Sequence, residues 1–174
     1  GSAAMVSVTQ GTGFFLITPD GVAGTISATV AFNVPGVTFG GSFKVLINNT
    51  GDPIDETFKV GVLPVTLSVV PGPYVSVEGS GVTLDVLGQT LSGNFRFEQI
   101  TLAGGGRLTR VSASEVALSL GGSTPVVSVT GGSGLFVVSP AGVAGQLVAN
   151  IAVKIPNVRL AGRVTVQVNN TMAA

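Results

Sequence analysis

The chain has 174 residues, of which 9% are charged and 45% hydrophobic, with 26 glycines, no cysteine and no histidine. Eight Lys and Arg balance eight Asp and Glu, so the chain lacks the basic surface that nucleic-acid binding requires. The missing cysteines exclude disulfides and thiolate chemistry, and the missing histidines remove the usual general base and the commonest zinc ligand.

Residues 1–5 read as an expression scar, and the first predicted unit, half A, covers residues 6–50. Apolar and polar residues alternate through much of this unit, as they do in a strand with one buried face. The apolar series Ile26, Ala28, Val30, for example, alternates with Thr25, Ser27 and Thr29. Two Pro- and Gly-containing segments separate the alternating runs and predict tight turns at Pro19–Gly21 and Val34–Gly36.

Residues 51–126 are predicted to form a linker followed by half B. The linker holds the acidic segment Asp52-Pro-Ile-Asp-Glu56, whose oxygen ligands could bind Ca²⁺. The alternative is a solvated linker with turn residues, because the Asp-x-Asp-x-Asp-Gly calcium loop is absent. Within half B, alternating runs are interrupted at Pro71–Pro73 and Gly104–Gly106.

Three carboxylates of half B, Asp85, Glu98 and Glu115, could form a carboxylate pair for glycoside chemistry. They occupy the polar positions of separate predicted strands, where charges ordinarily serve solubility. Serine and threonine are abundant, yet a nucleophile needs an activating base and no histidine is present. We therefore expect no enzyme activity and no catalytic, cofactor-binding or metal-binding residue.

Residues 127–171 are a second copy of half A. Val6-Ser-Val-Thr returns as Val127-Ser-Val-Thr, and the offset of 121 residues holds without a gap to Thr171, with 21 identities over 45 aligned positions. The Gly-rich segments Gly11–Gly13 and Gly131–Gly134 have no P-loop lysine, so we interpret them as turn or bulge glycines. The recurring Asn48-Asn-Thr50 and Asn169-Asn-Thr171 segments indicate a structural role for asparagine side chains at strand ends.

These patterns predict an all-β fold, specifically an elongated antiparallel β-meander, a sandwich-like tandem repeat. The alternative is a parallel β-solenoid, although solenoid coils usually repeat every 20 to 30 residues or so. Mean hydropathy is +0.63, but no apolar run approaches the ~20 residues that a membrane-spanning helix requires.

The segments Gly79–Glu98 and Val111–Gly121, together with the Asn-Asn-Thr endings, resemble the tandem β-repeats of giant bacterial secreted and surface proteins, which are adhesin-like chains. The resemblance covers nearly the whole chain and implies a location outside the cell, either secreted or on the bacterial cell surface. The Gly-punctuated strands also have a looser likeness to β-groove lipid-transfer proteins.

We therefore expect a structural module that acts as a stalk, fibre or adhesin spacer and whose partners are the neighbouring repeats of the same chain. Exposed strand edges make edge-to-edge self-association plausible. Six basic residues on outward faces would limit that pairing, namely Lys44, Arg96, Arg107, Arg110, Arg159 and Arg163. The alternative function is a hydrophobic-groove binding module for lipid or another apolar ligand.

Overall fold

The structure is a computed structural model that describes residues 6–102 and 104–171. The expression scar predicted at residues 1–5 lies outside the described residues. The described residues form eleven strands: β1 (Val6–Thr18), β2 (Gly21–Val34), β3 (Val37–Asn48), β4 (Ile54–Val60), β5 (Leu63–Val69), β6 (Tyr74–Val86), β7 (Gln89–Thr101), β8 (Arg107–Leu120), β9 (Val127–Ser139), β10 (Gly142–Ile155) and β11 (Val158–Asn169).

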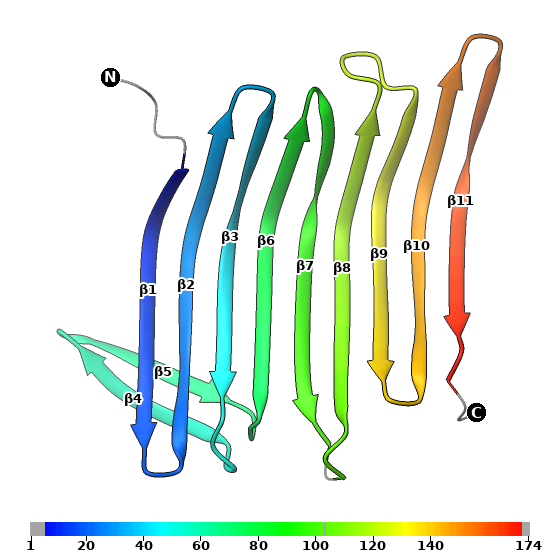
Figure 1. The fold of residues 1–174 in the computed structure, drawn as a ribbon. Helices are drawn as coiled ribbons and strands as arrows, with labels where there is room; N and C mark the ends of the chain where they lie inside the picture. The colour runs from blue at the N-terminus through cyan, green and yellow to red at the C-terminus, as the bar shows by residue number, and fades with distance from the viewer. Residues whose placement is uncertain (1–5, 103, 172–174) are drawn as a thin grey trace, which may run out of the picture.

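Nine of these strands form one antiparallel sheet in the order β1-β2-β3-β6-β7-β8-β9-β10-β11 (Figure 1). Each strand pairs with the next strand of the chain, except that the β4–β5 hairpin is inserted between β3 and β6. The sheet is open, because its edge strands β1 and β11 do not pair with each other. The prediction of an all-β antiparallel meander is confirmed, and the parallel solenoid alternative is wrong. The short turns between successive strands explain the antiparallel order, because a parallel crossover needs a dozen or more residues.

The described residues contain no helix. It follows that no helix in this part of the chain is long and apolar enough to cross a membrane. Valine, threonine and glycine dominate the composition, and helix-forming charged residues are scarce, which favours strands throughout.

The strands of the two half-A copies have the same bounds. Each bound of β1, β2 and β3 recurs 121 residues later in β9, β10 and β11. Local geometry recurs too: Gln10 of β1 and Gly131 of β9 both have a left-handed backbone, with φ of 55° and 58°. At both positions the strand register shifts, so each is a β-bulge.

The β4–β5 hairpin forms the only second layer among the described residues. It crosses the sheet near one end of β1, β2 and β3 (Figure 1). Its buried side chains pack against apolar side chains of the sheet in a small core made of Ala23, Ile54, Leu67, Val69 and Tyr74, flanked by Leu16, Leu46, Phe58 and Ile100. Phe14 of β1 also contacts Phe58 of β4 edge to face, with ring centroids 5.9 Å apart.

Candidate interaction surfaces

The side of the nine-stranded sheet that lies away from the hairpin, here called the open face, is apolar across its whole width. Residues paired across antiparallel strands lie on the same face, so the strand register defines rows of side chains. One complete row, from β1 to β11, is Gly13, Ile26, Val45, Val77, Phe97, Val111, Phe136, Gly145 and Val168. No member of this row is polar.

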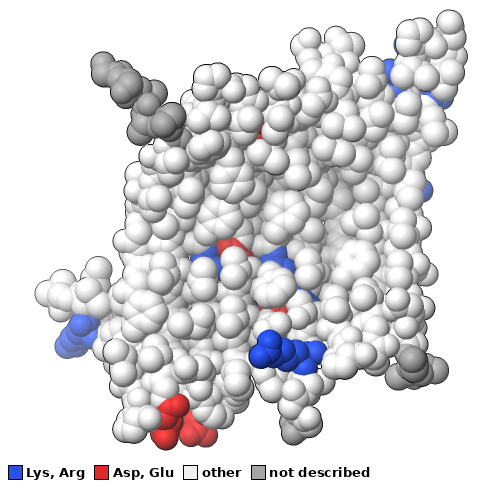
Figure 2. Space-filling model, viewed as in Figure 1, with Lys and Arg blue, Asp and Glu red and all other residues white. Residues whose placement is uncertain are grey.

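The open face is also uncovered. Near its middle, Val77, Phe97 and Val111 are 37%, 41% and 39% exposed. In Figure 2 the viewed face of the molecule is uncharged over most of its area, with charged atoms only in small patches near the middle and around the margins. A monomeric soluble protein rarely exposes a contiguous apolar surface this wide.

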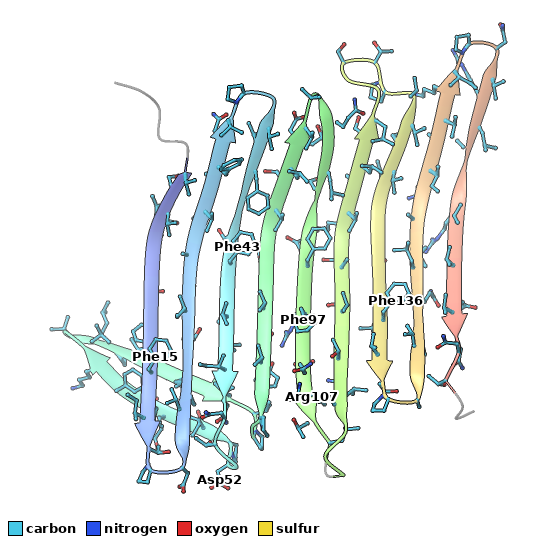
Figure 3. All side chains as sticks on the ribbon, viewed as in Figure 1. Phe15, Phe43, Asp52, Phe97, Arg107 and Phe136 are labelled. Atoms are coloured by element: carbon cyan, nitrogen blue, oxygen red, sulfur yellow. The ribbon has the colours of Figure 1, made fainter. Side chains whose placement is uncertain are left out.

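Several phenylalanine rings of the open face lie against glycines of the neighbouring strand. Phe15 is paired with Gly24, and Phe136 is paired with Gly145. A Cβ added at either glycine would collide with the ring of its partner. Figure 3 shows four rings of the open face, Phe15, Phe43, Phe97 and Phe136, distributed across the sheet; of these, Phe97 is paired with Val77 and Val111 and not with a glycine. Each glycine leaves space for a ring to lie down on the sheet, which flattens the surface.

The other side of the sheet, here called the hairpin face, is largely polar where the hairpin does not cover it. The row next to the apolar one is Thr12, Ser27, Lys44, Glu78, Arg96, Ser112, Leu135, Gln146 and Gln167. In this row only Leu135 is apolar. The sheet therefore separates an apolar face from a largely polar one.

Glu98 is the centre of the charged network on the hairpin face. Its carboxylate pairs with Arg96 at 3.3 Å and with Arg110 at 3.2 Å, and it accepts a hydrogen bond from the buried Tyr74 hydroxyl at 2.9 Å. Burial raises the pKa of Glu98. The hydrogen bonds from Tyr74 and Arg110 and the charges of Arg96 and Arg110 outweigh that effect, so the pKa lies below its usual value. The hydrogen bond to Tyr74 is the largest cause of the raised pKa of Arg96.

Shallow hollows on the hairpin face lie beside this network. One of about 350 Å³ is lined by Arg96, Glu98, Arg110, Ser112 and Leu135. A second of about 390 Å³ lies between β9, β10 and β11 and is lined by Ser128, Thr130, Asn150, Arg163 and their neighbours. Both hollows are open to solvent. The first is lined by charges that are paired with one another, and the second mainly by short polar side chains. Neither resembles an enclosed ligand site, in which a few polar groups converge on the ligand.

The predicted carboxylate candidates do not come together. Asp85 of β6 lies opposite Thr90 of β7. Glu98 lies eight residues beyond Thr90 on β7, which is about 26 Å at the rise of a β-strand. Glu115 accepts a hydrogen bond from Asn94, which is about 13 Å along β7 from either position. Glycosidase carboxylates are separated by roughly 5 to 9.5 Å, so no pair of this kind is formed.

The acidic linker segment does not gather its carboxylates either. Asp55 and Glu56 are consecutive residues of β4, so their side chains point to opposite sides of the hairpin. Within residues 6–102 and 104–171, no group of three or more Asp or Glu side chains lies close enough to hold a metal ion.

The recurring asparagines fasten strand ends, and Asn48 also fastens the hairpin. The Asn48 side chain donates to the backbone carbonyls of Asp52 and Val70, at 2.9 and 2.8 Å, and accepts from the backbone amide of Thr50. Asn48 is 1% exposed. Its counterpart Asn169 likewise accepts from the amide of Thr171, at 3.1 Å.

The second asparagine of each segment ties the chain to the β1–β2 or β9–β10 turn. Asn49 accepts from the amide of Val22, and Asn170 accepts from the amide of Val143 at 2.6 Å. Gly21 and Gly142 stand before these amides in a left-handed backbone, and a Cβ on either would collide with the asparagine. The same hydrogen bond between the second asparagine and the turn is therefore present in both copies.

Sequence reasoning missed two features of these surfaces. It did not predict the β4–β5 hairpin, although Val60-Gly61-Val62 between alternating residues is a possible hairpin signal. It also did not predict that the apolar face would remain uncovered, because alternation shows which residues share a face and not what lies above them.

No protein-family model, no curated protein and no solved structure matches this chain.

Proposed function

We propose that this chain is a non-enzymatic structural module of a tandem-repeat array. In this proposal the array belongs to a large secreted or surface-exposed bacterial protein, where it acts as a stalk, fibre or adhesin spacer. Its work is mechanical: each repeat adds width to a continuous sheet, and stability accumulates over repeats and the interfaces between them.

The observation that carries the proposal is the equivalence of the two half-A copies within one sheet. β9, the counterpart of β1, pairs with β8. The pairing runs from Leu120 opposite Val127 at one end to Thr109 opposite Val138 at the other. The second copy thus continues the first sheet instead of starting a separate domain. A following half B would find in β11 the same edge that β3 offers to β6.

The number of strands in the repeat supports the same proposal. In the sheet, one repeat of 121 residues comprises β1, β2, β3, β6, β7 and β8. Because neighbouring strands alternate in direction, only an even number of strands brings the next copy back in the same orientation. Six strands satisfy this condition, so further copies can follow with their strands running in the same direction as in the first.

The absence of a gathered catalytic set supports a non-enzymatic role. The chain has no histidine or cysteine, and its three candidate carboxylates lie too far apart to act as a pair. The charged groups that do meet, around Glu98, are paired with one another.

Small-angle X-ray scattering on chains carrying one, two and three copies of residues 6–126 tests the proposal. Strands are spaced about 4.8 Å apart, so each six-stranded repeat should lengthen the particle along the sheet by about 29 Å. A constant step of this size is the expected result. A step that shrinks with each copy, or scattering typical of flexibly linked beads, would contradict the array.

A further inference from the structure

The protein exposes far more surface than its mass predicts. Its accessible surface is 11090 Å², whereas a compact folded monomer of 17.3 kDa exposes about 7,800 Å². The excess of about 3,300 Å² arises because the sheet is a single layer apart from the hairpin. Most of the exposed large apolar residues of the sheet lie on the open face, among them Val77, Phe97 and Val111, and the hydrophobic effect favours covering them.

We propose that the open face packs against the open face of a second copy of this chain, so that two sheets form a β-sandwich. The inference concerns the faces and does not depend on the array proposed above. If each copy buried only half of its excess surface, the interface would total about 3,300 Å², which is within the range of obligate homodimers. Stacked sheets pack about 10 Å apart with their strands within about 30° of parallel. Two copies of this sheet can pack face to face in that arrangement.

The composition of the open face matches that of a homodimer interface. Its complete row is uncharged, so two copies meet there without like-charge repulsion. Polar residues of this face gather at one end of β7 and β8, where Gln99 faces Thr109 and Thr101 faces Arg107. Figure 3 places Arg107 near the lower end of the sheet. An apolar centre with a polar margin is typical of protein interfaces.

A second sheet fits this face better than a small apolar ligand does. Ligand sites are usually concave, with volumes of about 300 to 1,000 Å³. The hollow on the open face beside Phe15, Gly24, Ile26 and Val45 has a volume of about 20 Å³, which is too small for an acyl chain. The rings lying on glycines flatten the surface further, and a broad flat surface is complementary to another one like it.

The test compares the mass of the wild-type protein with that of two variants carrying the same new charge on opposite faces. Val111→Glu places the carboxylate on the open face, next to the middle strand β7. Ser112→Glu, one residue later, places it on the hairpin face opposite Arg96. Light scattering coupled to size-exclusion chromatography would be measured in detergent-free buffer, with circular dichroism to verify that each variant retains its β-sheet.

We expect a wild-type mass of about 35 kDa, twice that of the chain, and scattering from a particle two sheets thick. Val111→Glu should weaken the dimer at least about tenfold, because it buries an unpaired charge, while Ser112→Glu should change it little. If Val111→Glu does not fold, the pair Val164→Glu and Thr165→Glu on β11 repeats the comparison.

Three results would overturn the inference. The first is a wild-type monomer, with or without a co-purified lipid in native mass spectrometry. The second is a dimer that both charge variants weaken equally. The third is a dimer that is twice as wide as the monomer and only one sheet thick, which would mean that edge strands pair instead of faces.

Discussion

At the residue scale, the charged network shows how one carboxylate organises the polar face. Glu98 is 17% exposed, whereas Arg96 and Arg110 are 45% and 48% exposed. Solvent screens the outer parts of both arginines, so each pair contributes modestly, in the range of about 0 to 1 kcal/mol. The buried Tyr74 hydroxyl adds a directional hydrogen bond and links the network to the core below the hairpin.

Glu98→Gln should make the free energy of unfolding less dependent on pH in the acidic range. The pKa of Glu98 is lower in the folded protein than its ordinary value, so its contribution is present above about pH 4.3 and is lost as the pH falls through the folded-state pKa. We expect the variant to be less stable than wild type at pH 7 and equally stable in strong acid. Urea unfolding at several pH values measures this, with the exposed Glu56→Gln as control. A constant gap between wild type and variant across the series would contradict the linkage.

Thr25→Val should stabilise the protein. The Thr25 hydroxyl oxygen is buried and has no hydrogen-bond partner among the described residues, and its cross-strand neighbours are Phe14 and Leu46. Replacing it by an apolar group of the same shape removes a desolvation cost of about 1 kcal/mol or more. Thr29→Val is the matched control on the same face of β2, because the Thr29 hydroxyl donates to Gln10 at 3.2 Å. Equal effects of the two changes on the urea midpoint would argue against this explanation.

At the element scale, the side chains on the hairpin face differ between the two half-A copies. The hairpin covers the β1–β3 end of the sheet, while the equivalent positions on β9, β10 and β11 have no such cover among the described residues. Leu135, the counterpart of Phe14, is 51% exposed. Opposite it, Gln146 replaces Thr25 and accepts a hydrogen bond from Gln167 at 2.8 Å. Gln167 is itself the counterpart of the apolar Leu46, which packs against the core under the hairpin, so this part of the second copy is more polar than its equivalent.

Asn48→Ala should destabilise the protein more than Asn169→Ala. Asn48 is buried and satisfies the carbonyls at both ends of the hairpin, so its loss leaves buried acceptors unpaired at a cost of about 1 to 3 kcal/mol. Asn169 is exposed at the edge of the sheet, and its matched change should cost less than about 1 kcal/mol. Urea unfolding gives both values, and limited proteolysis should show faster cleavage between residues 54 and 69 in Asn48→Ala only. Equal losses in the two variants would show that Asn48 does not hold the hairpin.

Local sequence chemistry predicts much of the sheet and little of its surroundings. Alternation through Thr25–Val30 and the turn segments at Pro19–Gly21 and Val34–Gly36 predict strands and turns that the structure contains. The register shifts in β1 and β9 include Gly11 and Gly131, within the segments interpreted as turn or bulge glycines, but the positive φ of the non-glycine Gln10 does not follow from the local sequence. The hairpin depends on tertiary contacts such as that of Phe58 with Phe14, which a local pattern does not encode.

The network at Glu98 was only partly predictable. Its charge and strand position follow from the alternation of Phe95, Arg96, Phe97 and Glu98. Its partners follow from the register, which sets Arg110 opposite Glu98 and Ile100 opposite Tyr74. Register over several strands depends on turn geometry and on bulges. One such shift in the pairing of β6 with β7 lies between Gly79 and Val82, and the local sequence does not predict it.

At the scale of the whole molecule, the proposed array requires that the second copy continue the sheet of the first. Hydrogen exchange tests it with an internal control, because β1 and β9 are equivalent strands with different surroundings. The backbone amides of β9 that point toward β8 are paired, whereas their counterparts in β1 point toward the free edge of the sheet.

The measurement is amide hydrogen exchange followed by nuclear magnetic resonance, comparing each residue of β9 with the residue 121 positions earlier in β1. We expect every second amide of β9, on the side facing β8, to exchange much more slowly than its β1 counterpart, while the amides facing β10 and β2 exchange at similar rates. If the amides facing β8 exchange as fast as those at the β1 edge, the two copies fold as separate sheets and the continuous array is contradicted.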